Sequence, residues 1–275
     1  FPATITNTVQ ISSTAPPPEL NWADNQITQT TQIALPLQFK EVGRCALTQY
    51  YDTPQGNFRI HYTWTFPNKG VYPPYTSELD CHLRPPSSLP PDTLAPLADN
   101  GYPDYVTLLG DSLEQSYNTY GTMRYPITQL PRDQTTGRYP IFISSDPIWI
   151  DLPGGVIKEI SGTVGVTLPD KMYVSRSNAY APSRTIDFLR AEVGAHEMFH
   201  VMQWLYVPGF QVGRWFTSDE LRWWMEATAV WAAPKVYSQN GEYPRLLDAF
   251  LSEPYRSLTQ GGPRAYGSFV LATYL

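Results

Sequence analysis

The sequence predicts an α+β domain in which a group of strands precedes a mostly helical half. Three observations predict this class: strand-like runs mixed with one helical segment fall before residue 176, several helical segments follow Pro182, and 42% of the 275 residues are hydrophobic. A chain of this length and apolar content can bury a substantial core. Strands followed by several helices are typical of the α+β class, in which the two kinds of element are segregated.

The two ends of the chain differ from its centre. Residues 1–38 are rich in Thr, Gln and Pro and have little periodicity, which predicts an extended lead-in or linker. Residues 39–275 are therefore expected to form the folded domain. Because the chain stops at Leu275 inside an apolar pattern, without a C-cap glycine or a polar tail, we expect the natural protein to continue into a further C-terminal domain.

Four segments have the composition of strands. Residues 58–65 alternate apolar and polar side chains and are rich in aromatic and β-branched residues, a pattern that predicts a half-buried strand. Residues 139–144 and 171–175 are shorter candidates of the same kind. Residues 161–167 contain glycines among Thr and Val residues, which is typical of an edge strand.

Five segments have helical spacing: residues 106–117, 186–204, 218–233, 244–251 and 263–275. Ser183 or Thr185 can cap the second of these segments, and Pro208 and Gly209 follow its end. The third segment is expected to end before Pro234, because proline cannot donate the backbone hydrogen bond that continues a helix.

The charge of the chain argues against nucleic acids and anionic membranes as partners. The net charge is -6, the pI is near 5.2, and the 19 Lys and Arg residues form no run, so the basic footprint of such binders is missing. No stretch approaches the roughly 18 to 20 apolar residues of a membrane span. Any leader or anchor is expected outside this sequence.

Two cysteines, Cys45 and Cys81, are separated by 35 residues of strand-like and Pro-rich sequence. They can close one disulfide or remain free buried thiols. The abundance of Pro, Tyr and Thr resembles that of exported proteins, in which disulfides persist. We therefore expect a disulfide, and a secreted or cell-surface location.

The string His196-Glu197-Met198-Phe199-His200 lies inside the second predicted helix. Residues i and i+4 share one helix face, about 5 to 6 Å apart between Cβ atoms, so both imidazoles can bind one ion. Zinc suits such a pair, because it accepts neutral imidazole nitrogens and tolerates a water as fourth ligand. Glu197 can reach that water from the side and act as general base. The alternative is a pair of core histidines, with Glu197 in a surface ion pair.

A catalytic zinc site usually has three protein ligands, and Glu226 is the preferred third one. It lies in an otherwise apolar helical segment, residues 223–231, where a carboxylate is costly unless a cation compensates its charge. The alternative is an ion pair with Arg222, four residues earlier on the same helix. Asp219 and Glu220 are expected to cap the N-terminus of that helix.

In these two helices the chain resembles the zincin metallopeptidases, and within them the gluzincins, in which a helix after the H-E-x-x-H helix supplies a Glu ligand. Residues 224–229, with the sequence Trp-Met-Glu-Ala-Thr-Ala, are similar to the W-x-x-E-G-x-A segment of that family. Residues 57–63 and 100–106 are similar to segments that precede the zinc helix in a group of bacterial cell-surface metallopeptidases. The resemblance thus extends over most of residues 57–275.

The resemblance implies a zincin fold: a twisted mixed sheet with a backing helix, an edge strand beside the cleft, an active-site helix below it, and a mostly helical subdomain. Residues 162–167 would be the edge strand that holds an extended substrate by strand addition. The resemblance also implies that His196, His200 and Glu226 hold one zinc ion. With Glu197 as general base, the chain would then hydrolyse protein or peptide substrates.

Two features of the family are not matched directly. Some gluzincins carry an acid four residues after the Glu ligand to orient the first His, and this chain has Val230 there, so no orienting partner is assigned. Ala227 stands where the family has glycine. The family also stabilises the oxyanion with Tyr, His or Arg. Tyr266 is the candidate we choose, with Arg264 as an alternative and core packing as the other interpretation of Tyr266.

Two further groups of residues have alternative interpretations. Asp99, Asn100 and Asp104 offer oxygen ligands for calcium, or they form a turn and a helix cap. The tryptophans can line a substrate cleft or pack in the core. They are Trp204, Trp215, Trp223, Trp224 and Trp231.

Two functions compete with peptide hydrolysis. An exported adhesion or binding module would keep the fold without catalysis and use a metal for stability alone. A metal-dependent hydrolase of other acyl bonds would keep the chemistry, since activated water attacks those bonds too. A fourth protein ligand favours the structural role, whereas an open coordination position favours an enzyme.

Overall fold

The computed structural model describes residues 3–10, 26–33, 41–42, 45–47, 49–64, 82–83, 102–144, 148–152, 156–175, 186–206, 219–238, 243–259 and 262–274. Contacts divide the chain into two compact units, residues 1–40 and 41–275. The first unit contains β1 (Ala3–Gln10) and β2 (Gln26–Ile33), which pair antiparallel. The sequence analysis expected an extended lead-in here, because residues 1–38 are rich in Thr, Gln and Pro and have little periodicity. Their many Thr residues nevertheless favour strands.

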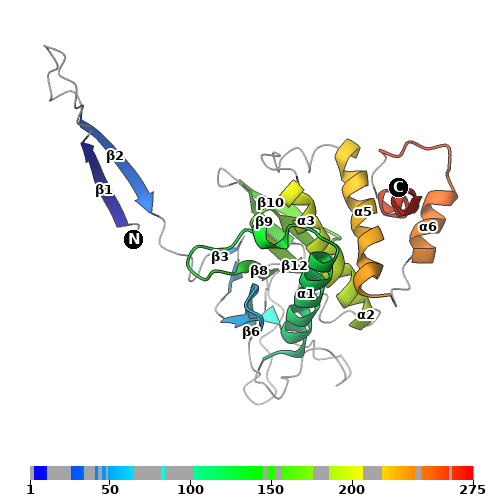
Figure 1. Ribbon diagram of the computed structural model, residues 1–275, viewed down its shortest axis with the longest axis horizontal. Helices are drawn as coiled ribbons and strands as arrows, with labels where there is room; N and C mark the ends of the chain where they lie inside the picture. The colour runs from blue at the N-terminus through cyan, green and yellow to red at the C-terminus, as the bar shows by residue number, and fades with distance from the viewer. Residues whose placement is uncertain are drawn as a thin grey trace, which may run out of the picture. The chain divides into compact units, whose positions relative to one another are not determined.

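The second unit is built on a mixed sheet of six strands (Figure 1). Its strands are β5 (Gln49–Asp52), β6 (Phe58–Trp64), β7 (His82–Leu83), β8 (Tyr139–Ser144), β11 (Gly165–Leu168) and β12 (Lys171–Ser175). Along the main path the order is β11-β12-β8-β6-β5, and β7 pairs with β6. β8 is parallel to β6 and to β12, whereas β5 and β11 are antiparallel to their neighbours. This mixed sheet, followed by helices, agrees with the predicted α+β class.

β11 lies at one end of the sheet, as the glycines of its segment predicted, and β6, β8 and β12 coincide with the other predicted strands. The edge strand is shorter than residues 161–167, because Gly162 has a positive φ of 72° and turns the chain before the strand begins. β5 was not predicted. Its four residues are too few to show a clear period.

Two small antiparallel pairs were also not predicted: β3 (Glu41–Val42) with β4 (Cys45–Ala46), and β9 (Ile148–Leu152) with β10 (Val156–Ile160). Ile148 and Ile150 of β9 belong to a small buried cluster with Val166 of β11 and Tyr173 of β12. Met172, which neighbours Tyr173 and points to the opposite face, belongs to the main core. The edge of the sheet is therefore supported on both faces.

The main core lies between the sheet and the first long helix, α1 (Asp104–Thr122). Val106, Leu109 and Leu113 of α1 are buried in one cluster with Phe58 and Ile60 of β6. These helix residues follow the 3-4 spacing that the sequence analysis used to predict the helix. A short 3-10 turn, η3 (Ile127–Gln129), then leads toward β8.

The second predicted helix is continuous in position but not uniform in hydrogen bonding. It consists of α2 (Ile186–Phe188), the π-helical segment η5 (Leu189–Glu197) and α3 (Met198–Tyr206). π-Helical turns are rare and occur preferentially at functional sites. Gly194 of η5 packs closely on α1, since an added Cβ atom would lie 2.5 Å from the Cβ of Ser112. The candidate N-caps, Ser183 and Thr185, lie outside the described residues.

The third predicted helix is longer than expected. α5 (Asp219–Val236) continues through Pro234, so the predicted end before this proline is wrong. Pro234 lies in the last turn, where it removes only one hydrogen bond of the helix. The backbone N–H of Tyr237 still donates to the carbonyl of Ala233 at 3.0 Å and closes the final turn.

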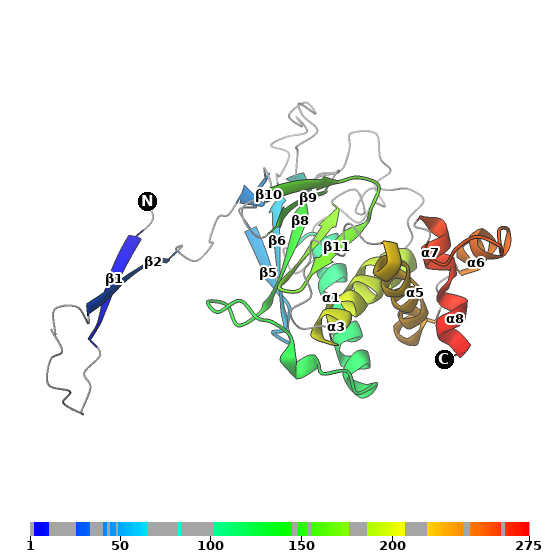
Figure 2. The same cartoon turned by 90° about the horizontal axis from the view of Figure 1, so that it is seen from above.

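The chain continues through α6 (Tyr243–Leu251), α7 (Pro263–Gly267) and α8 (Phe269–Tyr274). The last predicted helix is thus divided in two at Ser268. Both views place α5 between α3 and this C-terminal group of helices (Figures 1 and 2). Among the described residues, no helix is both long and apolar enough to cross a bilayer.

Candidate metal centre

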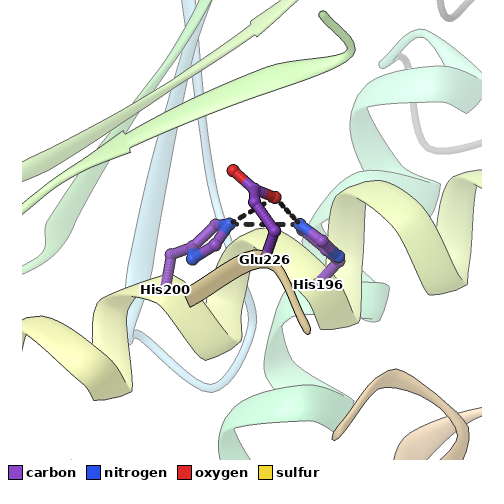
Figure 3. Close-up of side chains that lie close together, drawn as sticks. All are labelled: His196, His200 and Glu226. Atoms are coloured by element: carbon purple, nitrogen blue, oxygen red, sulfur yellow. Dashed lines mark hydrogen bonds and ion pairs between the residues drawn. The ribbon is translucent and has the colours of Figure 1, made fainter. Parts of the chain in front are cut away.

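His196, His200 and Glu226 converge in the interior of the second unit (Figure 3). The Nε2 atoms of the two histidines lie 3.1 Å apart, and Oε2 of Glu226 lies 3.2 Å from Nε2 of His196 and 3.6 Å from Nε2 of His200. All three residues are at most 4% exposed. The group can therefore hold a metal ion, with one donor atom from each side chain.

The two imidazoles share one helix face. His196 lies at the end of η5 and His200 lies in the first turn of α3, and the spacing of four residues brings their rings together at a centroid distance of 4.7 Å. The hydroxyl of Tyr120 on α1 donates to the carbonyl of Ala195 at 2.9 Å. The backbone beside His196 is thus held by the core helix.

Glu226 controls the charge of the metal-free group. Burial alone would lower the pKa of His196, but the hydrogen bond and the negative charge of Glu226 outweigh it and raise this pKa to about 9. Burial likewise disfavours the charged form of Glu226, yet the hydrogen bond with His196 and the proximity of the His200 imidazole bring its pKa well below the ordinary value. The carboxylate is therefore ionised, and a positive charge beside it is favoured.

His200 has an orienting partner that the sequence analysis did not find. Its Nδ1 atom lies 2.6 Å from Oε1 of Gln203. Nε2 of Gln203 donates to the carbonyl of Met225 at 2.8 Å and to the hydroxyl of Thr228 at 2.7 Å. Gln203 thus connects the ring of His200 to α5. Val230, at the position where an acid was sought, is buried and its side chain carries no charge.

His196 is held differently. Its Nδ1 atom is buried and has no hydrogen-bond partner in the part of the chain that the structure describes. The ring of Tyr266 stacks on the imidazole, with centroids 6.0 Å apart and an interplanar angle of 26°. The negative charge of Glu226 and burial raise the pKa of Tyr266 above its ordinary value, and its hydroxyl donates a hydrogen bond to Glu226. Tyr266 therefore lies beside the candidate ligands.

Arg264, the alternative to Tyr266, is engaged elsewhere. Its guanidinium donates four hydrogen bonds to backbone carbonyls between α6 and α7, at distances of 2.7 to 3.2 Å. The acceptors are Phe250, Glu253, Arg256 and Ser257. Arg264 is 5% exposed, so its position indicates a structural role in the C-terminal helices.

The side chain of Glu197 extends from η5 toward the edge strand β11. Its Oε2 atom accepts a hydrogen bond of 2.6 Å from the hydroxyl of Thr167 on β11. A Cβ atom added to Gly165 would lie 2.8 Å from both Cδ and Oε1 of Glu197, so glycine lets the carboxylate approach the strand this closely. Burial raises the pKa of Glu197, against the opposing effects of the two histidines and of Thr167. A buried carboxylate of raised pKa beside a metal-binding group can accept and return a proton.

Of the tryptophans predicted to line a cleft or pack in the core, those that the structure describes include examples of both. Trp204 is buried, and its Nε1 atom donates to the carbonyl of Thr167 at 3.1 Å. Trp204, Trp224 and Trp231 also line a cavity of about 320 Å³ between α3 and α5. Gln203 is part of the cavity wall, whereas His196, His200 and Glu226 are not among the residues that line it. Trp223 packs edge-on against Trp224.

Several predicted residues lie outside the part of the chain that the structure describes. These are Cys81 of the expected disulfide, Asp99 and Asn100 of the possible calcium site, and Trp215. Asp104 is the first residue of α1 and Pro103 is its N-cap, so a helix does start here but Asp104 is not the cap. The disulfide and the calcium site therefore stay predictions.

Sequence reasoning missed two residues that contact the site, Gln203 and Thr167. Gln203 follows His200 by three residues, so helical spacing does place it beside that ring, but polar residues at this spacing are common on helices. Thr167 lies in the predicted edge strand, yet only the packing of β11 on the helix brings it to Glu197.

Comparison with known proteins does not identify the chain. No protein-family model, no curated protein and no solved structure matches it.

Proposed function

We propose that the chain is an exported zinc-dependent peptidase with a zincin-like architecture, which hydrolyses peptide bonds with activated water. The observation that carries the proposal is the convergence of two Nε2 atoms and one carboxylate oxygen beside a fourth buried group, Glu197. A shared cation accounts for this arrangement.

The donor set supports zinc as the ion. Tetrahedral coordination with bonds of about 2.0 to 2.1 Å places the ligand atoms about 3.3 Å from one another. The three observed separations are 3.1, 3.2 and 3.6 Å. Two imidazoles and one carboxylate are the ligands of a common class of catalytic zinc site, in which the fourth position stays open. His196, His200 and Glu226 would hold the ion.

The chemistry divides between the ion and the protein. When bound, zinc supplies Lewis acidity, which polarises a carbonyl and makes water acidic near neutral pH. Glu197 removes the proton from the attacking water and returns it to the amine that leaves. Thr167 keeps the carboxylate of Glu197 at the edge strand, and Gly165 leaves room for it. In this proposal Tyr266 donates a hydrogen bond to the oxyanion of the tetrahedral intermediate, once the ion replaces its hydroxyl as the partner of Glu226.

The test compares metal content and turnover in the same samples. Glu197→Gln should retain stoichiometric zinc and lose about 10²- to 10⁴-fold in turnover of a casein-type substrate, the range of general-base catalysis. His200→Ala should lose both zinc and turnover. Glu159→Gln, a matched change of an exposed carboxyl on β10, should change neither. Wild-type turnover in Glu197→Gln would refute the assignment of the base.

The same experiment separates the competing functions. Stoichiometric zinc without turnover of any peptide would support the exported binding module. Turnover of ester or other acyl substrates, but not of peptides, would support a different hydrolase. Absence of zinc from the wild-type protein, even after incubation with the ion, would refute the metal centre itself.

A further inference from the structure

We infer that Gln203 is a positioning residue for the metal centre. Gln203 holds the ring of His200 in the one tautomer whose Nε2 can bind a cation. Hydrogen bonds to α5 in turn set the orientation of the Gln203 amide. The inference rests on the proposed function, because that function requires His200 to bind the ion through Nε2. The orienting group of His200 is thus a neutral amide on its own helix, whereas the acid sought at position 230 was expected to orient the first histidine, His196.

Donor and acceptor are fixed in each hydrogen bond around Gln203, because backbone carbonyls of α5 are the acceptors at one end of the network. The carbonyl of Trp224 accepts from the hydroxyl of Thr228 at 2.8 Å, and the carbonyl of Met225 accepts from Nε2 of Gln203 at 2.8 Å. A carbonyl oxygen can only accept. The single proton of Thr228 is therefore directed to the helix, and its oxygen accepts from Nε2 of Gln203 at 2.7 Å.

The direction continues to His200. Because the NH₂ group of Gln203 faces α5, its Oε1 atom is the one that lies 2.6 Å from Nδ1 of His200. An amide oxygen only accepts, so Nδ1 must carry the proton of the neutral imidazole. Nε2 then keeps its lone pair, and this is the atom that lies 3.6 Å from Glu226. The tautomer needed for metal binding is thus set before an ion binds.

This arrangement also explains why glutamine stands at this position. Gln203 belongs to the helix of His200, while Met225 adjoins Glu226 on α5. The amide therefore holds together the two helices that supply the ligands. A carboxylate would accept from Nδ1 more strongly, but it could not donate to the carbonyl of Met225. Gln203 orients the ring without adding a second negative charge.

Three variants test the inference: Gln203→Leu, Gln203→Glu and, as a matched control, Gln115→Leu on the exposed face of α1. Zinc affinity is measured by competition with a chelator, and folding by circular dichroism. The tautomer of His200 is read from imidazole ¹⁵N shifts of the metal-free protein at alkaline pH. Gln203→Leu should bind zinc about 10- to 100-fold more weakly, the usual effect of losing an orienting partner, and should lose the single Nδ1–H tautomer. Gln115→Leu should match the wild type.

Gln203→Glu tests whether Gln203 must both accept from Nδ1 of His200 and donate to α5, or whether an acceptor beside His200 is sufficient. We expect it to bind zinc more weakly than the wild type, because the carboxylate and the carbonyl of Met225 repel each other. Equal or tighter binding by Gln203→Glu, or wild-type affinity and tautomer in Gln203→Leu, would overturn the inference. Since the tautomer is measured without metal, a wild-type protein that binds zinc but cleaves no peptide would refute the proposed function and leave the role of Gln203 intact.

Discussion

Two of the buried carboxyl groups of the second unit, Glu114 beside the β5–β6 turn and Glu226 in the candidate metal centre, have different partners. Glu114 of α1 is 1% exposed and Glu226 of α5 is 4% exposed. Glu114 meets the hydroxyl of Thr53, together with the backbone N–H and side-chain amide of Asn57 at 3.2 and 2.7 Å. Glu226 meets two imidazole nitrogens and a tyrosine hydroxyl.

The difference shows that burial alone does not mark a functional carboxyl group. The partners of Glu114 are neutral donors in the turn between β5 and β6, so this side chain fastens α1 to the sheet. The partners of Glu226 can donate a proton or offer a lone pair, and lone pairs are what a cation binds. Each of the following changes is expected to separate the structural role from the binding role.

The largest effect is expected for Glu226→Ala. Structural zinc sites bind with about 10 to 16 kcal/mol for four ligands, so one ligand contributes about 3 kcal/mol or more. Glu226→Ala should therefore weaken zinc binding by roughly 10²- to 10³-fold and abolish the zinc-dependent rise in Tm. Glu114→Ala should retain wild-type zinc affinity. Equal affinities of Glu226→Ala and the wild type, by isothermal titration calorimetry, would remove Glu226 from the ligand set.

Glu114→Ala should act on folding instead. It removes the acceptor shared by the buried hydroxyl of Thr53 and the half-buried donors of Asn57, and it creates a cavity, which together cost about 3 kcal/mol of unfolding free energy. Urea denaturation of the metal-free protein measures this loss. Asp111→Ala, an exposed carboxyl on the same helix, provides the control and should change the unfolding free energy by less than about 0.5 kcal/mol. A loss of similar size in both variants would contradict the structural role of Glu114.

Gly165→Ala addresses the third buried carboxylate, Glu197. The added methyl group would lie 2.8 Å from the carboxylate, and the flexible side chain of Glu197 is the part that can move. We expect about 10²-fold lower turnover, since displacements of about 1 Å have effects of that order, with unchanged zinc affinity and a small change in Tm. Unchanged turnover would show that the position of Glu197 is not critical.

The smallest effect is expected for the pH dependence of stability and concerns His61, a histidine outside the candidate metal centre. Burial and the charge of Arg59 lower the pKa of His61 to about 4, with Asp52 and Asp133 opposing, whereas Glu226 raises that of His196. Because the folded protein disfavours protonation of His61, stability should be full above pH 6.5 and fall as the pH drops from about 6.5 to 4. The expected loss is about 1–3 kcal/mol.

His61→Phe isolates this contribution, because phenylalanine can keep the stacking on Phe142, whose ring centroid lies 4.9 Å from the imidazole. Denaturation curves at several pH values should show a smaller decrease in stability for His61→Phe than for the wild type over that window. Parallel curves for the two proteins would assign the acid sensitivity to other groups.

The local pattern of apolar and polar residues was sufficient to predict an element when that element's own residues define its buried face. Residues 58–65, 139–144 and 171–175 were predicted as strands and correspond to β6, β8 and β12, since alternation marks a face within one segment. The pattern was insufficient for β5 and for the β9–β10 pair, which depend on neighbouring strands. The end of α5 was predicted at Pro234 and lies at Val236, because one missing hydrogen bond in a last turn is tolerated when the turn can still close.

The amino-acid sequence by itself determined that His196 and His200 share a helix face, because the helical period relates residues four apart. It also marked Glu226, since a carboxylate in an apolar helix requires a compensating partner. Only the tertiary structure decided that Glu226 reaches both rings, that Gln203 orients His200 and that Arg264 is held by backbone carbonyls. These contacts join separate elements, and their geometry depends on how two surfaces pack, which the periodicity of one segment does not encode.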